Sequence, residues 1–380
     1  MKLNNKNKED ILYVIAFAII LIASLLQMTA IYTRCDNPVI GTVTNLVQAF
    51  GYFLCIVKIV LSRRKYDIKK IVFSIMMLML FLVSGMNIQH KFFFLTAILF
   101  VATFGVDSVI ISKVALCIQG VILFVVVILS QVGVLEDKIF ISGARIRHIL
   151  GFNWVTVAPI IFFFSCLLYF YVRSDKMKWY EAIPLEIINI YFYQMTDTRM
   201  TFLLCSIVIV FFAIQSIWNG WFDLLRKLKW LYPVVPVILV IIAILAAYLY
   251  NPENALWLKL NAIMSSRLQL SHDAIMYYGM PLLGQKIVWN GFGLLNDGQV
   301  TNYNYVDCSY LQIGMWYGVL VLVVVIFIFI CGIYKAIKVN NYWAVFIMLF
   351  AMLHSMTEPH LINVAVDVVI LLTFSDIKSF

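Results

Sequence analysis

The sequence predicts an all-α integral membrane protein, a polytopic bundle of about 12 transmembrane helices (roughly 10 to 12) with one long outward loop. The chain of 380 residues is 63% hydrophobic and only 12% charged, whereas a soluble domain is roughly half apolar and a quarter charged. Its mean hydropathy is +0.96, and the apolar residues occur in blocks of about 20, the length that spans a bilayer. These observations exclude a water-soluble enzyme, a disordered chain and a nucleic-acid-binding domain, despite the net charge of +9.

Each span is expected to be a helix, because in lipid the backbone must satisfy its own hydrogen bonds and a barrel strand would alternate rather than run continuously apolar. The blocks place spans at residues 11–32, 39–61, 70–87, 92–111, 114–133, 153–172, 182–196, 200–218, 231–250, 309–331, 342–356 and 361–374. The first block is too long for a signal peptide core and is expected to stay as a span. Five of the seven cysteines fall in spans, and a bridge between the other two, Cys35 and Cys308, is one alternative.

The basic residues predict the orientation of the spans. Alternate loops and both termini carry 18 Lys and Arg, and the opposite loops carry nine. Because short cytoplasmic loops are enriched in basic residues, both termini are expected in the cytoplasm. Two outward segments are then long, at residues 134–153 and 251–308.

Arginine has an unusual distribution. Five of the nine arginines fall on the outward side, where the charge bias disfavours them: Arg34, Arg145, Arg147, Arg199 and Arg267. The planar guanidinium binds phosphate and carboxylate bidentately and keeps its charge near apolar surroundings. We therefore expect an anion site at the outer membrane interface, with contact to lipid head groups or plain solvation as the alternative.

Two short motifs lie where spans meet the outer surface. Asp197 in Thr196-Asp197-Thr198-Arg199 either holds the Arg199 side chain or caps the next helix. Arg145-x-Arg147-His148 precedes another span and suggests an anion site, with a solvated loop as the alternative.

The long loop carries further polar residues. Residues 255–278 have apolar positions at helical spacing and are predicted to form one or two amphipathic helices, with Arg267 nearby. Asp307 leads into a span and is either a general base toward a sugar hydroxyl or a helix cap.

The last two spans also bring ionisable residues to the outer surface. His354, Glu358 and His360 are candidates for substrate binding there, and a histidine in an apolar helix is otherwise a hydrogen-bonded packing residue. Asp367 within the last span is a functional candidate or a buried hydrogen-bonding group.

Motifs for cofactors are absent from the sequence. It has no Walker A motif, no dinucleotide-binding glycine fingerprint, no Asp-x-Asp and no HExxH. We therefore expect no cofactor and no catalytic metal.

Taken together, these residues resemble a Wzy-type polymerase of a capsule or exopolysaccharide cluster, similar in plan to the wider O-antigen polymerase and ligase family. The resemblance rests on the dozen or so spans with a long outward loop before the last few, and on four motifs. These are Arg145-x-Arg147-His148-x-x-Gly151-Phe152, Thr196-Asp197-Thr198-Arg199, Ser266-Arg267 with Gly284 downstream, and Val306-Asp307-x-x-Tyr310-Leu311 followed by Tyr317-Gly318.

The resemblance implies a glycosyltransferase on the outer face of the bacterial cytoplasmic membrane. Such enzymes move a glycan from undecaprenyl pyrophosphate to the terminal sugar hydroxyl of another lipid-linked repeat unit, without a nucleotide sugar or a metal. Arg199 and Arg267 match outward arginines that hold the donor pyrophosphate, and Arg145, Arg147 and His148 match a family arginine loop. A flippase and a chain-length regulator are the implied partners, and nucleic acid is not one.

Two bidentate arginines would stabilise a pyrophosphate leaving group without a metal. The outward loop would roof the site, and its tyrosines would stack on sugar rings: Tyr277, Tyr278, Tyr303 and Tyr305. Asp307 lies at the position where related ligases have a histidine, and this difference favours a polymerase over a ligase. The general base is then either Asp307 or His354. The competing hypotheses are a ligase that transfers glycan to another acceptor, a flippase or transporter for lipid-linked sugars, and a nonenzymatic membrane scaffold.

Overall fold

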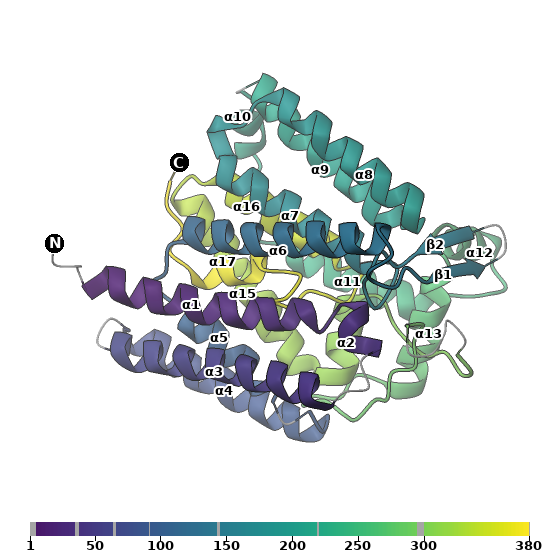
Figure 1. Ribbon diagram of the computed structural model, residues 1–380, viewed down its shortest axis with the longest axis horizontal. Coiled ribbons are helices and arrows are strands. Elements are labelled where there is room, and N and C mark those ends of the chain that lie inside the picture. Colours follow the sequence, from purple (N-terminus) through teal and green to yellow (C-terminus); the bar gives the residue numbers. More distant parts are fainter. Residues whose placement is uncertain are drawn as a thin grey trace.

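The computed structural model in Figure 1 describes residues 5–34, 38–63, 66–90, 92–142, 145–218, 220–294 and 300–379. Most of these residues are helical, and the one sheet among them is a two-stranded hairpin. Its strands β1 (Ile139–Ser142) and β2 (Arg145–His148) pair antiparallel, with Phe140 opposite Arg147.

Seven helices in the described ranges are long and apolar enough to cross a membrane. They are α1 (Asn5–Leu26), α3 (Pro38–Ser62), α4 (Ile68–Asn87), α6 (Ser108–Gln131), α7 (Val157–Arg173), α9 (Arg199–Ile217) and α15 (Val319–Lys338). The chain thus has the helices of an all-α membrane protein, as predicted, but the predicted count of about 12 spans is not confirmed.

The other helices are shorter. They are α2 (Ala30–Arg34), α5 (Phe94–Ala102), α8 (Ala182–Thr196), α10 (Gly220–Arg226), α11 (Val235–Leu249), α12 (Ala255–Ile263), α13 (Arg267–Tyr278), α14 (Ser309–Gln312), α16 (Tyr342–His354) and α17 (Val369–Phe374). Two 3-10 turns (Ser174–Lys176 and Trp179–Glu181) and a π-helical turn (Ile313–Tyr317) complete the secondary structure of the described residues. Helices α12 and α13 occupy the part of the outward loop where amphipathic helices were expected.

The predicted span 92–111 is not a continuous helix. It is divided between α5, which has nine residues, and the first turn of α6. The chain turns at residues 103–107, and the side chain of Asp107 accepts a hydrogen bond from Val109 N at 2.8 Å. Asp107 is therefore the N-cap of α6. A hydropathy pattern does not reveal a helix start inside an apolar stretch.

The predicted span 309–331 is interrupted by a glycine. Gly318 has φ +104, and a Cβ atom at this position would lie 2.4 Å from Gly284 N, so that no side chain fits. The chain runs from the π-helical turn Ile313–Tyr317 through Gly318 into α15, which is therefore displaced to residues 319–338.

The predicted span 361–374 is helical only in α17, which has six residues. Residues 355–368 run irregularly through the interior, and we call them the inner segment. Gln119 of α6 holds it by donating Nε2 to the carbonyl oxygens of Ala365 and Val366, each at 3.0 Å. Irregular backbone at membrane depth is tolerated where protein buries it, and such segments carry binding sites in many membrane proteins.

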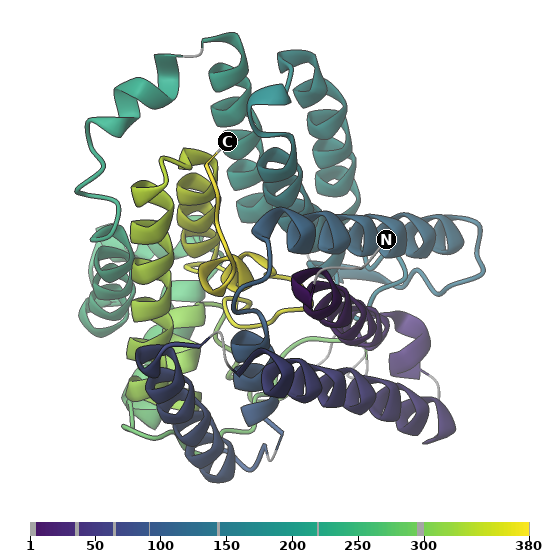
Figure 2. The ribbon, with the colours of Figure 1, turned by 90° about the vertical axis from the view of Figure 1, so that its left-hand side faces the viewer.

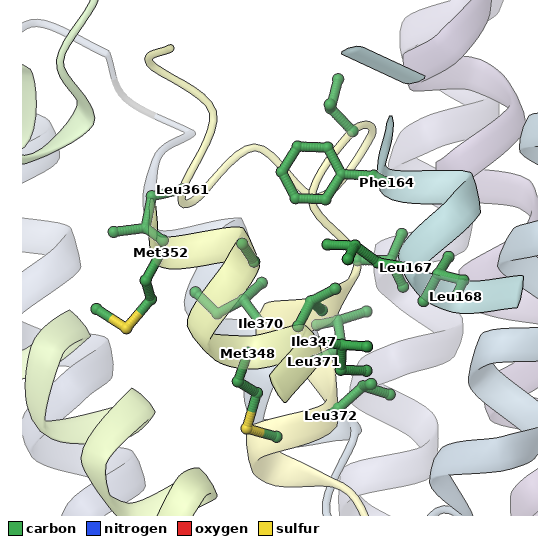
Figure 3. Packing of buried hydrophobic residues seen from close by; sticks show 14 of the residues in the cluster. Phe164, Leu167, Leu168, Ile347, Met348, Met352, Leu361, Ile370, Leu371 and Leu372 are labelled. Carbon is green, nitrogen blue, oxygen red and sulfur yellow. The ribbon is translucent and has the colours of Figure 1, made fainter. Parts of the chain in front are cut away.

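Helix α7 forms the centre of the core, because 14 of its 17 residues are buried. Figure 3 shows α7, α16 and α17 side chains packed together, among them Phe164, Leu168, Ile347 and Leu371. Lipid is as apolar as these side chains, so close packing rather than removal from water holds such helices together.

The two ends of the bundle differ. In Figure 1 the start of α1 and the segment after α17 lie at one end, toward which Figure 2 looks, while the hairpin and helices α12 and α13 lie at the other. Asp376 N donates to Val106 O at 2.7 Å, which ties the C-terminal segment to the start of α6. We call these the terminal end and the loop end.

Candidate functional site

A cavity of about 720 Å³ opens at the loop end. Its walls come from the hairpin, the α8–α9 junction, the start of α13, the residues before α14 and the inner segment. Ten of the site residues named from the sequence line it: Arg145, Arg147, Asp197, Arg199, Arg267, Tyr303, Tyr305, Asp307, Glu358 and His360. These residues are spread over more than 200 positions of the chain, so the fold brings them together.

One side of the cavity, which we call the arginine half, contains Arg145, Arg147, Asp197 and Arg199. Side chains two residues apart on a strand point to the same face, so β2 directs both of its arginines into the cavity. Arg145 Nε donates to Asp197 Oδ2, and its Nη2 donates to Asp197 O at 2.7 Å. Arg147 Nε donates to Thr196 O at 2.8 Å, and within the described residues its terminal nitrogens make no further hydrogen bond.

Asp197 organises this half from the junction of α8 and α9. Its backbone is left-handed, with φ 44, which turns the chain sharply between the two helices. The carboxylate accepts from Arg199 Nε at 3.1 Å and Nη2 at 3.4 Å, and it does not cap α9. Of the two roles expected for Asp197, holding arginines is therefore the one that the structure has.

The charges of the arginine half are unbalanced, because it holds three arginines and one carboxylate, which pairs with Arg145 and Arg199. Burial alone would raise the pKa of Asp197, but the hydrogen bonds from Arg199 and Arg145 outweigh burial and lower it. Burial, with Arg145 nearby, lowers the pKa of Arg147 to about 10, so Arg147 still carries its charge at pH 7. The Arg199 side chain is 61% exposed. This half therefore offers cationic donors to an anion.

The other side, which we call the carboxylate half, contains Arg267, Asp307 and Glu358. Arg267 Nε donates to Asp307 Oδ2 at 2.7 Å, and its Nη2 donates to Glu358 Oε1 at 2.9 Å. Arg267 is the first residue of α13. Glu358 belongs to the inner segment, and its backbone oxygen accepts a hydrogen bond from Ser309 Oγ at 2.6 Å.

Here two carboxylates share one arginine. Burial lowers the pKa of Arg267, but Glu358 and Asp307 outweigh burial, so that the pKa is raised overall and the charge is kept. The Glu358 side chain is 4% exposed. Burial raises the pKa of Glu358 to about 8 against the opposing effect of Arg267, and the negative charge of Asp307 adds to the rise. At neutral pH Glu358 therefore keeps its proton next to the charged guanidinium of Arg267.

Aromatic side chains and a histidine also line the cavity. Trp154 stacks on Phe292 with ring centroids 6.0 Å apart, and Phe292 lies 4.7 Å from Tyr303. Burial raises the pKa of Tyr305 to about 12, so its phenol is neutral. Burial also lowers the pKa of His360, which leaves a neutral imidazole at pH 7. Trp154 and Phe292 were not named from the sequence, although Trp154 follows the arginine loop directly.

Four residues named from the sequence do not line the cavity. His148 lies on the opposite face of β2 from the two arginines, and its Nδ1 is 2.7 Å from Asp137 Oδ2. His354 is fully buried, stacks on Phe163 at 4.4 Å, and contacts Thr201 Oγ1 through Nε2 at 3.3 Å. It is therefore a packing residue.

The two adjacent tyrosines of α13 also lie elsewhere. Tyr277 is 82% exposed, and Tyr278 accepts from Asn304 Nδ2 at 2.8 Å and packs on Trp289. Neither is placed to stack on a ligand in the cavity, whereas Tyr303 and Tyr305 do line it.

Two further residues named from the sequence, Asp367 and Cys308, also lie outside the lining of the cavity. Asp367 Oδ1 accepts from Val369 N, the first residue of α17, at 3.0 Å. Cys308 is a buried free thiol, while Cys35 and the side chain of Arg34 lie outside the described residues. Across the described ranges, no group of three or more His, Cys, Asp or Glu side chains is arranged to hold a metal ion.

Comparison of the chain with protein-family models, curated proteins and solved structures finds no match.

Proposed function

We propose that the protein polymerises glycan repeat units carried on undecaprenyl pyrophosphate, as the family resemblance implies. The observation that carries this proposal is the gathering of four arginines in one cavity at the end of a bundle of apolar helices. A ligand that combines an anionic group with a lipid tail matches both features. By the bias of basic residues, the loop end faces the outside of the bacterial cytoplasmic membrane and both termini lie in the cytoplasm.

The arginine half is the proposed site of the donor pyrophosphate. Arg147 has terminal nitrogens without a described partner, and Arg199 is exposed to the cavity. Such donors bind phosphate oxygens bidentately and stabilise the charge that builds up as the pyrophosphate departs. Arg267, expected from the sequence to share this task, already donates to two carboxylates. We assign it instead to positioning those carboxylates.

The carboxylate half is the proposed site of acid–base chemistry. Asp307 binds Arg267 through Oδ2, and its Oδ1 makes no hydrogen bond to another described residue. In the proposed step Oδ1 accepts the proton of the acceptor hydroxyl, whose oxygen forms a bond to the anomeric carbon. The bond between that carbon and the phosphate oxygen breaks at the same time, and its electron pair leaves with the lipid pyrophosphate. No oxidant, reductant or metal enters this balance.

A deletion strain of the native host tests the proposal. Lipid-linked glycans are profiled, and their accessibility to an external probe is measured. Single repeat units that accumulate on the outer face are the expected result. Units trapped inside would assign the protein to transport as a flippase, and long lipid-linked polymer that is never attached would assign it to ligation. An unchanged profile would remove glycan assembly altogether.

A further inference from the structure

A second cavity lies beside the first, between α1, α3, α5 and the inner segment. Its volume is about 290 Å³, close to the lower end of about 300 Å³ for small-molecule sites. Polar side chains on its walls carry only amides and hydroxyls: Ser24, Gln27, Gln48, Tyr52, Thr96 and Asn363. No charged side chain and no histidine is among its described lining residues. The cavity is therefore polar but neutral, unlike the arginine-lined cavity.

The two cavities share a wall. Met28 lines both of them. The inner segment also contributes to both cavities, because His360 lines the first and Asn363 lines the second. Asn363 Nδ2 lies 3.5 Å from His360 Nδ1. A molecule in the second cavity would thus lie next to one bound between the arginine and carboxylate halves.

Several polar groups on the walls of the second cavity make no hydrogen bond to another described residue. Gln48 Nε2 donates to Ser24 Oγ at 2.9 Å, and Gln27 Nε2 donates to Asn45 Oδ1 at 3.2 Å. The amide oxygens of both glutamines, and the hydroxyls of Tyr52 and Thr96, make no hydrogen bond to another described residue. These side chains are partly exposed rather than buried, so a ligand in the cavity can reach them. A ligand rich in hydroxyl groups would pair them.

We propose that the second cavity is a subsite for one uncharged sugar residue of the glycan. Amides and hydroxyls both donate to and accept from sugar hydroxyls, and the partly exposed ring of Tyr52 offers apolar contact to a sugar face. The neutral lining disfavours pyrophosphate, which belongs to the arginine half. The identity of the ligand as part of a lipid-linked glycan rests on the proposed function, but the binding of a neutral sugar does not.

The test uses the full-length protein in lipid nanodiscs and two separate probes. Saturation-transfer NMR measures binding of a panel of neutral methyl glycosides, and phosphorus NMR measures binding of inorganic pyrophosphate. Gln48→Leu is expected to weaken glycoside binding about tenfold, as loss of hydrogen bonds would do, and to leave pyrophosphate binding unchanged. Arg147→Gln is expected to do the reverse. Thr44→Val, on the same helix but outside the cavity, is the matched control.

The inference is overturned if no glycoside of the panel binds, or if Gln48→Leu binds glycosides as the wild type does. Should Gln48→Leu fail to fold, judged by its melting curve, Thr96→Val is measured against the same criterion. Glycoside binding that depends on Gln48, in a protein that does not bind pyrophosphate, would support the sugar subsite and contradict the proposed function. The two failures are therefore distinguishable.

Discussion

The two halves of the main cavity use the same residue types in opposite proportions. In the arginine half, Asp197 is shared by Arg145 and Arg199, with Arg147 beside them. In the carboxylate half, Arg267 is shared by two carboxylates. One half therefore has cationic donors left for an anion, and the other has carboxylate oxygens left for a proton.

The partners of an arginine, rather than its presence in a cavity, therefore decide what it can bind. Arg267 is 18% exposed and donates to two carboxylates, so an anion would have to displace them at the cost of leaving buried charges unpaired. Arg199 is 61% exposed and shares its only carboxylate partner within the described residues with Arg145. An anion can approach Arg199 without breaking a buried pair.

The largest expected effect comes from removing the cation of the carboxylate half. Arg267→Met leaves Asp307 and Glu358 without their shared partner, and breaking a buried charge pair typically costs about 3–5 kcal/mol. We expect a clearly lower melting temperature in detergent and no polymer formation in cells. In the double variant Arg267→Met/Asp307→Asn, which also removes the carboxylate left unpaired, much of the stability should return while polymer formation stays lost. A single variant that melts like the wild type would show that the carboxylate half is not held together by Arg267.

In the arginine half, Arg147→Gln should separate activity from stability. Removing one preorganised donor to a developing negative charge typically slows a reaction about 10²–10³-fold. Because Arg147 makes a single hydrogen bond to the described residues, at Thr196 O, the melting temperature should change little. The measurement is the rate of polymer formation from a lipid-linked repeat unit in proteoliposomes.

Arg147→Lys should not restore this rate, because a lysine cannot form the bidentate fork. Arg226→Gln provides the matched control, since Arg226 pairs with Asp223 in α10, away from the cavity. Equal losses of stability in Arg147→Gln and Arg267→Met would erase the distinction between the halves.

A smaller effect is expected from pH and concerns Glu358 alone. Its pKa rises from an ordinary value of 4.5 to about 8 in the folded protein. Between these values the unfolded chain has lost the proton that the folded protein keeps, so rising pH favours unfolding. The stabilising contribution of protonated Glu358 is complete below pH 4.5, declines up to about pH 8 and is constant above it.

The melting temperature of the wild type should therefore fall by roughly 4 °C between pH 5 and pH 8. In Glu358→Gln the fall should be much smaller, because the glutamine does not titrate. An identical pH dependence in both proteins would mean that Glu358 is ionised throughout this range and that Arg267 holds two charged carboxylates.

The sequence predicted the members of the two halves better than their pairing. The outward arginines stood out because they oppose the charge bias, and their neighbours Asp197 and Asp307 followed from short motifs. The pairing of Arg267 with Asp307 and Glu358 joins residues 40 and 91 positions apart, and no local pattern contains that information. The position of His354 could not be predicted for the same reason. Hydropathy does not show which side of α16 faces the packed core.

The predicted span count is not confirmed, for a related physical reason. Hydropathy measures apolar content, which is high in residues 92–111 and 361–374 even though both are interrupted. Asp107 starts a new helix in the first case, and Gln119 secures an irregular backbone in the second. These interruptions place the inner segment, with Glu358 and His360, against the cavity.

The smallest expected effect tests whether the two halves enclose the whole ligand site. Tyr277 is 82% exposed and lies outside the cavity, whereas Tyr303 lines it and contacts Phe292. Tyr277→Ala should change the rate of polymer formation by less than about twofold, which is under roughly 0.5 kcal/mol. Tyr303→Ala should slow it further, because it removes an aromatic surface between the halves. If both variants lost activity equally, the glycan would have to extend over α13, and the site would be larger than the two halves.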